Sequence, residues 1–290
     1  MSIPVSHTLQ PTEAPNNRCL QQAANVFAYS IARMANPFIL VTPATRGLSL
    51  ALTRHYLRTT NLPVYATHRS GSAEDTHANI MSSLSRVDRD RLKLLTLDLT
   101  SESSIRDAAS TLADSLPEKA YLHTGFFTGG MLHPEKGPGE IDHDKLKEAF
   151  QINVLSHMLL IKHFSRFLPK AAQFSGTDPA KWVHVSARVG SISDNHKGGW
   201  YSYRSSKAAL NQVIKTFDNQ LVMQKSPSIC VGVHPGTVKT NLSKDFWGNV
   251  SRGSLFEPEY AAERLVNVVT NLKEEQRGKV WDFAGKQVPW

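Results

Sequence analysis

The sequence predicts one doubly wound α/β domain, with about seven parallel strands in a central sheet and helices on both of its faces. From residue 38 onward, short apolar runs rich in Val, Ile and Leu alternate with stretches whose apolar residues recur at helical spacing. Such uniformly apolar strands are typical of a parallel sheet that helices cover on both sides. The chain has 290 residues, which suffice for one large core, and neither a repeat nor a linker divides residues 37–290.

The predicted strands and helices alternate in a regular order. The apolar runs that we expect to form strands lie at 38–41, 64–66, 92–97, 120–123, 182–185, 229–233 and 280–283. The stretches that we expect to form helices lie between them, at 47–57, 72–84, 102–116, 142–168, 203–223 and 258–272. This alternation favours a single sheet built from successive strand–helix–strand units.

Composition and charge exclude several classes of protein. The formal net charge is +8, but the basic residues are dispersed, so we expect small anionic ligands and no nucleic-acid partner. No apolar run is long enough to span a membrane. Cys19 and Cys230 provide neither a disulfide framework nor a metal-ligand spacing, so we expect no metal site and a reducing compartment, the cytoplasm.

Residues 1–36 differ in composition from the rest of the chain. They contain a single acidic residue, Glu13, and apolar positions recur at helical spacing between Arg18 and Met34. One interpretation is an additional helix of the domain, which we favour because two arginines are few for a transit peptide. The other interpretation is a presequence, which would change the predicted location to the mitochondrion.

Tyr203 and Lys207 are the first indication of chemistry. Residues at i and i+4 share one face of a helix, so both side chains can point into the same cleft. An ammonium group beside a phenol lowers the pKa of the phenol from its usual value of about 10. We therefore expect Tyr203 to act as an acid or base near neutral pH, although the spacing alone is common by chance.

The wider motif, Tyr-x-x-Ser-Lys-Ala-Ala-Leu from Tyr203, resembles the active-site helix of the short-chain dehydrogenases/reductases. The resemblance covers about residues 38–290, and carbonyl reductases of this family share the phrase Arg-Val-Gly-Ser-Ile. It implies a Rossmann-type domain in which Tyr203 passes a proton to or from the substrate oxygen. It also implies that Lys207 adjusts the pKa of the tyrosine and holds the nicotinamide ribose. Asn153 matches the residue that sustains a water relay to the lysine.

The serine of this catalytic group departs from the family pattern. The family carries Ser-Ser-x-x-Gly after its fifth strand, and alignment on Gly190 places Ala187 where the catalytic serine belongs. Ser186 lies one residue earlier and reaches the cleft only if the strand end bends, because consecutive strand residues face opposite sides. We predict that Ser186 hydrogen-bonds the substrate oxygen, with Ser191 as the alternative.

The loop after the first predicted strand resembles the family's Thr-Gly-x-x-x-Gly-x-Gly, which seats a pyrophosphate on a helix N-terminus. Two of its positions are kept, and Pro43 and Ser49 replace the other two glycines. Proline removes one backbone N–H from the loop. The predicted cofactor-binding residues of this loop are Thr42, Arg46, Gly47 and Leu48.

Charge near this loop favours NADP(H) over NAD(H) as the cofactor. An NAD site has Asp or Glu about 20 residues past the glycine loop, where it binds the ribose hydroxyl. Here Arg69 takes that place and the next acidic residue is Glu74. Arg46 directly precedes Gly47, as in many NADP-preferring members of the family. Two guanidinium groups can hold a 2′-phosphate through charge-assisted hydrogen bonds.

The resemblance implies three further contacts with the cofactor. Asp98 and Leu99 lie in a segment similar to the one whose Asp binds the adenine amino group. Residues 122–125 take the place of the family's Asn-Asn-Ala-Gly and keep only Gly125. The segment after the sixth predicted strand resembles Pro-Gly-x-Val-x-Thr, which meets the nicotinamide carboxamide. Its predicted binding residues are Pro235, Gly236, Val238 and Thr240.

Together these motifs predict an NADP(H)-dependent oxidoreductase that reduces a small ketone or aldehyde, or oxidises the alcohol. Aromatic residues between Phe246 and Phe256 indicate an apolar lid but do not identify the substrate. The alternative is a non-catalytic nucleotide-binding or interaction protein of the same fold, which Ala187 and the altered loop favour and the retained Tyr203 and Lys207 oppose. By resemblance we expect a homodimer or homotetramer that pairs through the fourth and fifth helices.

Overall fold

The computed structural model describes residues 36–171, 174, 176–251 and 253–290. Our two interpretations of residues 1–36 therefore lie outside the described residues, apart from Asn36, which begins the first strand. Within the described part of the chain, no helix is both long and apolar enough to cross a membrane.

The central sheet has eight strands in the order β10-β9-β6-β5-β4-β1-β2-β3. These strands are β1 (Asn36–Thr42), β2 (Val64–His68), β3 (Leu92–Thr96), β4 (Ala120–Phe127), β5 (Ala180–Val185), β6 (Ser228–His234), β9 (Val280–Asp282) and β10 (Gln287–Val288). All neighbours pair in parallel except β10, which is antiparallel to β9. The predicted doubly wound sheet is confirmed, and β10 is too short to show an apolar run in the sequence. A separate parallel pair consists of β7 (Thr237–Val238) and β8 (Leu255–Phe256).

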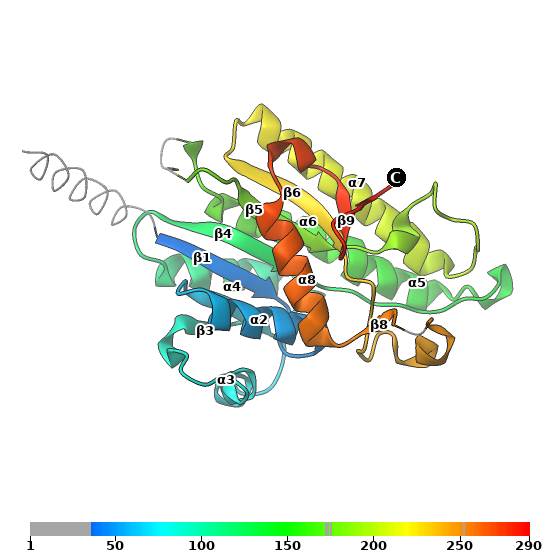
Figure 1. Cartoon of the computed structure of the whole chain (residues 1–290), viewed down its shortest axis with the longest axis horizontal. Helices are drawn as coiled ribbons and strands as arrows, with labels where there is room; N and C mark the ends of the chain where they lie inside the picture. The colour runs from blue at the N-terminus through cyan, green and yellow to red at the C-terminus, as the bar shows by residue number, and fades with distance from the viewer. Residues whose placement is uncertain (1–35, 172–173, 175, 252) are drawn as a thin grey trace, which may run out of the picture. The chain divides into compact units, whose positions relative to one another are not determined.

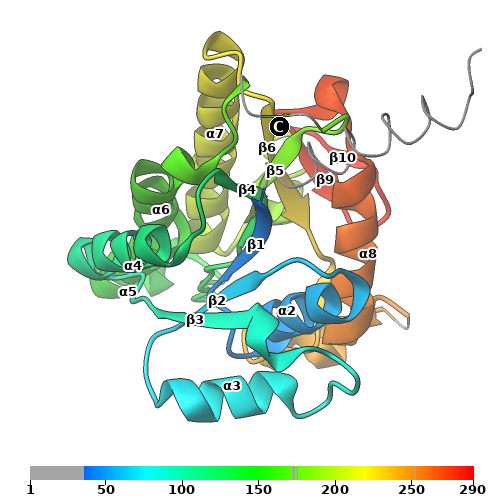
Figure 2. The same cartoon turned by 90° about the vertical axis from the view of Figure 1, so that its left-hand side faces the viewer.

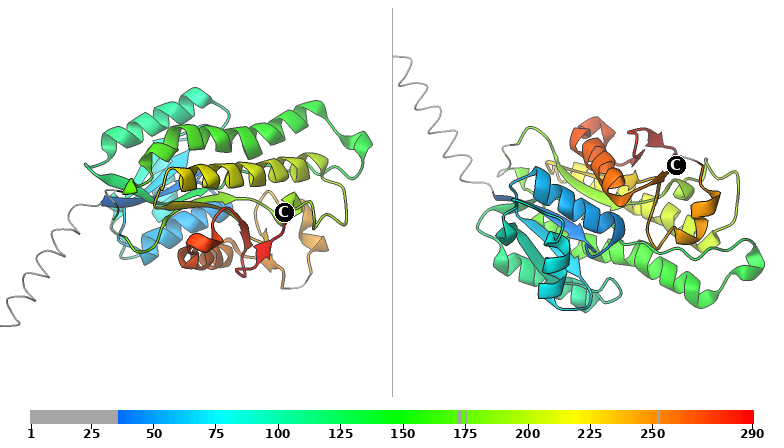
Figure 3. Two further views of the ribbon diagram at one scale, coloured as in Figure 1. Left: turned by 90° about the horizontal axis from the view of Figure 1, so that it is seen from above. Right: turned by 60° about the horizontal axis from the view of Figure 1, so that its bottom comes forward.

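Helices cover both faces of the sheet, as predicted (Figures 1 and 2). They are α2 (Gly47–Thr59), α3 (Ala73–Met81), α4 (Glu102–Ser115), α5 (His143–Phe150), α6 (Ser156–Phe164), α7 (Tyr201–Met223) and α8 (Pro258–Asn271). Figure 3 shows α2 and α8 on one side of the sheet and α4, α6 and α7 on the other. Two apolar cores match these layers, one containing Leu52 and Leu265 and the other containing Leu160 and Leu210. Short 3₁₀ turns complete the chain: η1 (Arg89–Arg91), η2 (Pro138–Glu140), η4 (Ser165–Phe167), η6 (Arg188–Gly190), η7 (Lys244–Asn249) and η8 (Glu274–Gln276).

The long helix that we predicted over 142–168 is divided in the structure. A π-helical segment, η3 (Gln151–Leu155), lies between α5 and α6, and η4 follows α6. A π segment inserts one extra residue per turn and is frequent at functional sites. The π segment contacts α7 and carries Asn153, one of the predicted catalytic residues.

The order of the strands predicts a ligand site at the carboxyl ends of the central strands, beside β1. The chain builds β2 and β3 on one side of β1 and β4, β5 and β6 on the other. Beside β1 the connections therefore leave in opposite directions, and ligands of open α/β sheets bind at the carboxyl ends of the strands at such a switch point. Thr42 ends β1 there, and its carbonyl accepts a hydrogen bond from the N–H of Thr128, directly after β4, at 2.7 Å.

Candidate active site

Tyr203 and Lys207 lie together near the start of α7, on the face that packs against the sheet. Their residues are 8% and 2% exposed, and the Lys207 ammonium lies 5.8 Å from the centre of the Tyr203 ring. Lys207 Nζ donates a hydrogen bond to the carbonyl of Val185, the last residue of β5, at 2.9 Å. At Gly190 a Cβ atom would come within 2.8 Å of the Lys207 backbone, so only glycine lets this turn pack so close to α7. Lys207 thus ties α7 to the end of β5, and Tyr203 lies one helical turn before it.

Burial shifts the pKa of both side chains away from the charged form. It raises the pKa of Tyr203 to about 12 and lowers the pKa of Lys207 to about 7. Our expectation that the lysine lowers the pKa of the phenol is wrong for this structure, because burial disfavours the charged phenolate and raises its pKa. At neutral pH the phenol therefore keeps its proton, which suits a proton donor.

Asn153 joins the loop after β4 to α7. Its side-chain amide forms two bonds with the backbone of Met131: Nδ2 donates to the carbonyl at 2.9 Å and Oδ1 accepts from the N–H at 2.8 Å. Nδ2 also donates to Ser206 Oγ at 2.9 Å. Asn153 is fully buried and reaches α7 through Ser206, the neighbour of Lys207.

The hydroxyl groups near the end of β5 are engaged within the protein. Ser186 Oγ donates to Asn211 Oδ1 at 2.6 Å. Ser191 Oγ donates to the carbonyl of Trp290 at 3.2 Å. Ala187 lies between them and is buried, but it carries no hydroxyl. Ser186 is thus bonded to Asn211 of α7, and Ser191 is bonded to Trp290.

The start of α2 has the properties of an anion site. The helix has no acidic residue in its first turn, and the residue before it, Arg46, makes no side-chain cap. Gly47 has a φ of +55°, and a Cβ atom there would come within 2.9 Å of Thr240 Cγ2. Ser49 Oγ is hydrogen-bonded to Thr128 Oγ1 at 2.7 Å. Two predicted cofactor segments, at Gly47 and at Thr240, therefore meet, and the free N–H groups of the helix start lie beside them.

The other predicted residues of this loop have structural contacts. Thr42 is buried and its hydroxyl accepts a hydrogen bond from Thr67 Oγ1 at 2.8 Å. The peptide bond between Thr42 and Pro43 is cis. Leu48 is partly buried and packs against the core that α2 and α8 share. Thr42 and Leu48 thus anchor the two ends of the loop in the protein.

Arg69, Asp98 and Leu99 follow β2 and β3 on the same side of β1. Asp98 Oδ1 accepts hydrogen bonds from the Thr100 N–H at 2.9 Å and from the Thr100 hydroxyl at 2.7 Å. These bonds, with a smaller contribution from the Arg69 charge, lower the pKa of Asp98. Leu99 packs against Gly129, where a Cβ atom would come within 2.7 Å of Leu99 Cδ1. The segment of Asp98 and Leu99 therefore contacts the loop that follows β4.

Gly125 does not lie where we predicted it. It is an interior residue of β4, and a Cβ atom there would come within 2.9 Å of the Phe127 ring. The strand continues to Phe127, and the loop at the switch point begins with Thr128 and contains Gly129 and Gly130. A Cβ atom at Gly130 would lie 3.7 Å from Lys207 Nζ. The paired glycines after an apolar strand were the sequence signal that we missed.

A buried chain of hydrogen bonds ends on the same loop. Trp182 Nε1 donates to His184 Nε2 at 2.8 Å, His184 Nδ1 is 2.7 Å from His157 Nδ1, and His157 Nε2 is 3.0 Å from the Gly129 carbonyl. An indole can only donate and a carbonyl can only accept, so both imidazoles are neutral and each carries one defined proton. Burial accordingly lowers the pKa of His157 to about 3 and that of His184 well below its usual range. No sequence motif indicates this chain of hydrogen bonds.

The segment after β6 makes a tight turn at Gly236, which packs against Phe256 of β8. Gly236, which follows Pro235, has a φ of +75°, and a Cβ atom there would come within 2.6 Å of the Phe256 ring. Val238 lies in β7, which pairs with β8, and its carbonyl accepts a hydrogen bond from Ser243 Oγ at 2.5 Å. The predicted segment thus leads from the sheet to Thr240 beside the start of α2.

Aromatic side chains border the phenol of Tyr203. The Trp200 ring lies 6.1 Å from the Tyr203 ring in an edge-to-face arrangement. It also lies 4.8 Å from the ring of Phe246, which belongs to η7. A residue of the predicted lid, Phe246, therefore contacts Trp200 at the start of α7, and Trp200 in turn borders the Tyr203 ring.

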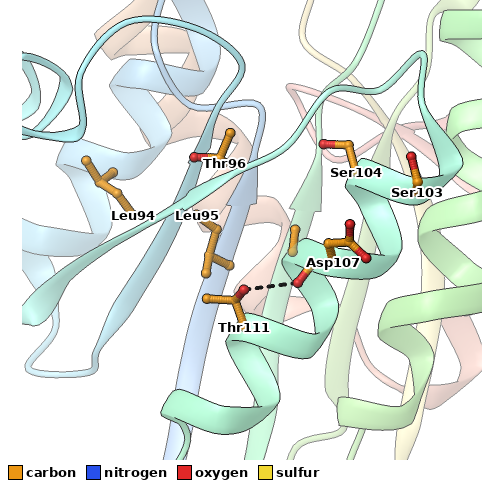
Figure 4. Close-up of a pocket in the computed structure, with 8 residues that line it drawn as sticks. Leu94, Leu95, Thr96, Ser103, Ser104, Asp107 and Thr111 are labelled. Carbon is orange, nitrogen blue, oxygen red and sulfur yellow. Dashed lines mark hydrogen bonds between the residues drawn. The ribbon is translucent and has the colours of Figure 1, made fainter.

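A separate hollow of about 480 Å³ lies between the edge strand β3 and α4. Figure 4 shows its wall, with Leu95 of β3 pointing toward α4, whose polar side chains Ser103, Ser104 and Asp107 also line the hollow. It contains none of the predicted site residues. Among the described residues, no group of three or more His, Cys, Asp or Glu side chains could hold a metal ion.

The chain is similar to proteins of one known family. A sequence model of the short chain dehydrogenase family matches residues 37–250. The chain is 32% identical to the 1-hydroxy-2-glutathionyl-2-methyl-3-butene dehydrogenase of Rhodococcus sp. strain AD45, over 67% of this chain and 78% of the relative.

Solved structures agree with this match. The NADPH-bound carbonyl reductase from chicken fatty liver superposes with a TM-score of 0.75 at 27% identity, covering 87% of this chain and 98% of that one. A short-chain dehydrogenase/reductase of Burkholderia multivorans with bound NADP gives a TM-score of 0.69 at 26% identity, covering 88% and 100%.

Proposed function

The chain belongs to the short chain dehydrogenase family, and on that premise we propose that it reduces a ketone or aldehyde, with Tyr203 as the proton donor. It is an oxidoreductase that uses NADP(H), by its family and by its likeness to NADP-bound carbonyl reductases. The observation that carries the proposal is the buried pair of Tyr203 and Lys207 on α7, in which Lys207 bonds to the carbonyl of Val185 at the end of β5.

Each catalytic residue has a distinct part in the proposed reaction. NADPH, when bound, supplies the hydride that the carbonyl carbon receives. Tyr203 gives its phenolic proton to the carbonyl oxygen, so the product is an alcohol. A pKa raised to about 12 keeps that proton in place at neutral pH until the oxygen becomes basic. Lys207 holds the ribose, and Asn153 fixes the loop of Met131 and Gly130 against α7.

The residues that follow the carboxyl ends of the central strands fit a dinucleotide with an additional phosphate. The open helix start at Gly47 can bind the pyrophosphate, since its N–H groups are not capped. Arg46 and Arg69 would hold the 2′-phosphate, and Asp98 the adenine. At the loop after β4 we replace Gly125 by Gly129 and Gly130, which allow close approach of a ligand to the backbone.

The decisive experiment is NADPH oxidation by the full chain with a broad panel of ketones and aldehydes. Turnover of at least one carbonyl compound is the expected result. Tight NADPH binding without turnover across the panel would instead support the non-catalytic protein of the same fold, the alternative that Ala187 favours.

We expect Arg46→Ala and Arg69→Ala to weaken binding of NADPH more than binding of NADH. Each lost charge-assisted bond to the 2′-phosphate should contribute about 1.5–3 kcal/mol, or roughly a tenfold or larger change in Kd. Fluorescence titration with both cofactors measures the difference. Arg58→Ala is the matched control, because Arg58 is exposed at the opposite end of α2. Equal weakening of NADPH and NADH would show that these arginines do not contact the 2′-phosphate.

We expect Ala187→Ser to raise kcat by about tenfold. The substitution adds a donor at the family's serine position, whereas the Ser186 hydroxyl already donates to Asn211. Steady-state kinetics with the best substrate of the panel measures the gain. Ala187→Cys is the control of similar size, since a thiol is a weak donor. If Ser186→Ala lowers kcat about 100-fold and Ala187→Ser changes nothing, Ser186 is the catalytic hydroxyl as first predicted.

The predicted self-association remains part of the proposal. Leu155 in η3 and Met158 in α6 are large apolar side chains that are half exposed. They belong to the helices through which we expect two copies to pair. Sedimentation of the full chain measures the oligomeric state, and a monomer at micromolar concentration would contradict the expectation.

A further inference from the structure

The helix that carries Tyr203 begins without a cap of its own. The residue before α7, Trp200, is in the left-handed region with a φ of 50° and makes no side-chain cap. The first turn of α7 also contains no acidic residue. The first N–H groups of a helix have no partner within the helix, so they must be satisfied by another part of the protein.

Glu135 supplies that partner from the loop after β4. Its carboxylate oxygens lie 3.3 and 3.4 Å from the Ser202 N–H, which donates to them. Its backbone carbonyl accepts a hydrogen bond from the Trp200 N–H at 2.6 Å. A negative charge at the start of a helix is stabilised by the free N–H groups and the helix dipole. Glu135 therefore contacts the residues on either side of Tyr201, within one turn of Tyr203.

Glu135 is buried although no cation pairs with it in the described part of the chain. It is only 4% exposed. Other buried carboxylates of the protein have a guanidinium partner: Asp218 pairs with Arg277 and Asp282 pairs with Arg188. A buried carboxylate without a cation is unfavourable unless hydrogen bonds compensate it. For Glu135 the start of α7 provides this compensation.

The turn before α7 fits closely around this contact. Gly199 has a φ of +65°, and a Cβ atom there would come within 3.2 Å of the Glu135 carbonyl. From the other side, Arg204 Nε donates to the carbonyls of Gly198 and Gly199 at 3.1 Å. The turn before α7 is thus held by Glu135 from the loop after β4 and by Arg204 from the first turn of α7 itself.

We propose that Glu135 is a positioning residue for the reaction: its carboxylate fixes the first turn of α7 and thereby the place of the Tyr203 phenol. Tyr203 directly follows Ser202, so a shift of this turn moves the phenol relative to the substrate oxygen. A displacement of about 1 Å is enough to lower a rate roughly 100-fold. This proposal rests on the proposed reductase function.

The test compares Glu135→Ala and Glu135→Gln with a matched control, Glu140→Ala. Glu140 is an exposed carboxylate nearby that accepts from the Lys136 N–H. We expect kcat per NADPH-binding site to fall about 100-fold in Glu135→Ala, with KM and the Kd of NADPH within threefold of the parent. Glu135→Gln keeps an acceptor oxygen but loses the charge, so kcat should fall only about fivefold. The control should match the parent.

Normalisation to NADPH-binding sites separates positioning from folding. If Glu135→Ala melts at a lower temperature but keeps the parent's kcat per site, Glu135 is only structural and the proposal is overturned. If Glu135→Ala fails to fold, the Gln variant decides: an unchanged kcat overturns the proposal and a reduced kcat at unchanged Kd supports it.

A readout without turnover keeps the two proposals distinct. Hydrogen exchange of the amides of residues 201–204 should be faster in Glu135→Ala than in the parent and unchanged in Glu140→Ala. If the parent reduces no carbonyl compound, the proposed function is wrong, and Glu135 then has no role in positioning a catalytic residue. Unchanged exchange in Glu135→Ala would refute the contact itself, even in an active enzyme.

Discussion

Replacement of Tyr203 by Phe should lower kcat by a factor of about 1,000 or more while NADPH still binds with a Kd within threefold of the parent. General acid catalysis contributes factors of about 100 to 10,000, and Tyr203→Phe removes only the hydroxyl that we propose as the proton donor. Because the ring remains, its contact with Trp200 and the packing of α7 should persist. Steady-state NADPH oxidation and fluorescence titration of the cofactor measure the two quantities.

Tyr201→Phe is the control for this result. Tyr201 lies on the same helix, two residues earlier, but its side chain is exposed. The control should keep the activity of the parent. Activity of Tyr203→Phe within a few-fold of the parent would remove Tyr203 from the mechanism.

Replacement of Lys207 by Met should abolish turnover and at the same time make the protein more stable at pH 7. Burial lowers the pKa of Lys207 from 10.5 to about 7, so between these values the unfolded chain binds more protons than the folded one. The stability of the parent therefore rises with pH from about 7 to 10.5. Methionine fills a similar volume without a charge, so we expect a Tm higher by about 4 °C at pH 7 and no such rise with pH.

Thermal melts between pH 7 and 9 measure this effect, and Lys215→Met provides the control. Lys215 is an exposed lysine of the same helix, and its replacement should leave activity and the pH dependence of the Tm unchanged. If Lys207→Met melts at a lower temperature than the parent at every pH, the bond from Lys207 to the Val185 carbonyl outweighs the burial of the charge.

The sheet and its helices could be predicted from the sequence because both follow from local patterns. Apolar runs and helical spacing located the seven parallel strands and the helices that cover them. The π segment around Asn153 could not be predicted, since an extra residue in one turn leaves the apolar spacing of the helix nearly unchanged. The end of β4 was missed because we ended the predicted strand at residue 123 and placed Gly125 after it, whereas the strand continues to Phe127.

For the candidate site, sequence motifs indicated residues but not their partners. The spacing of Tyr203 and Lys207 predicted a shared face, and the structure has both on it. The same motif gave a wrong direction for the pKa of the phenol, because burial depends on packing by residues distant in the sequence. Glu135 and the histidines could not be predicted either, since their partners lie 67 and 27 residues away.

The hydrogen-bond chain from Trp182 to Gly129 has a consequence for proton movement. Its first member cannot accept a proton and its last member cannot give one up, so the intervening imidazoles cannot exchange roles without breaking a bond. This chain of hydrogen bonds does not carry protons through the interior of the protein, although paired imidazoles often act as proton shuttles. If Tyr203 gives up its proton as proposed, this chain of hydrogen bonds cannot supply the replacement, which must reach Tyr203 by another route.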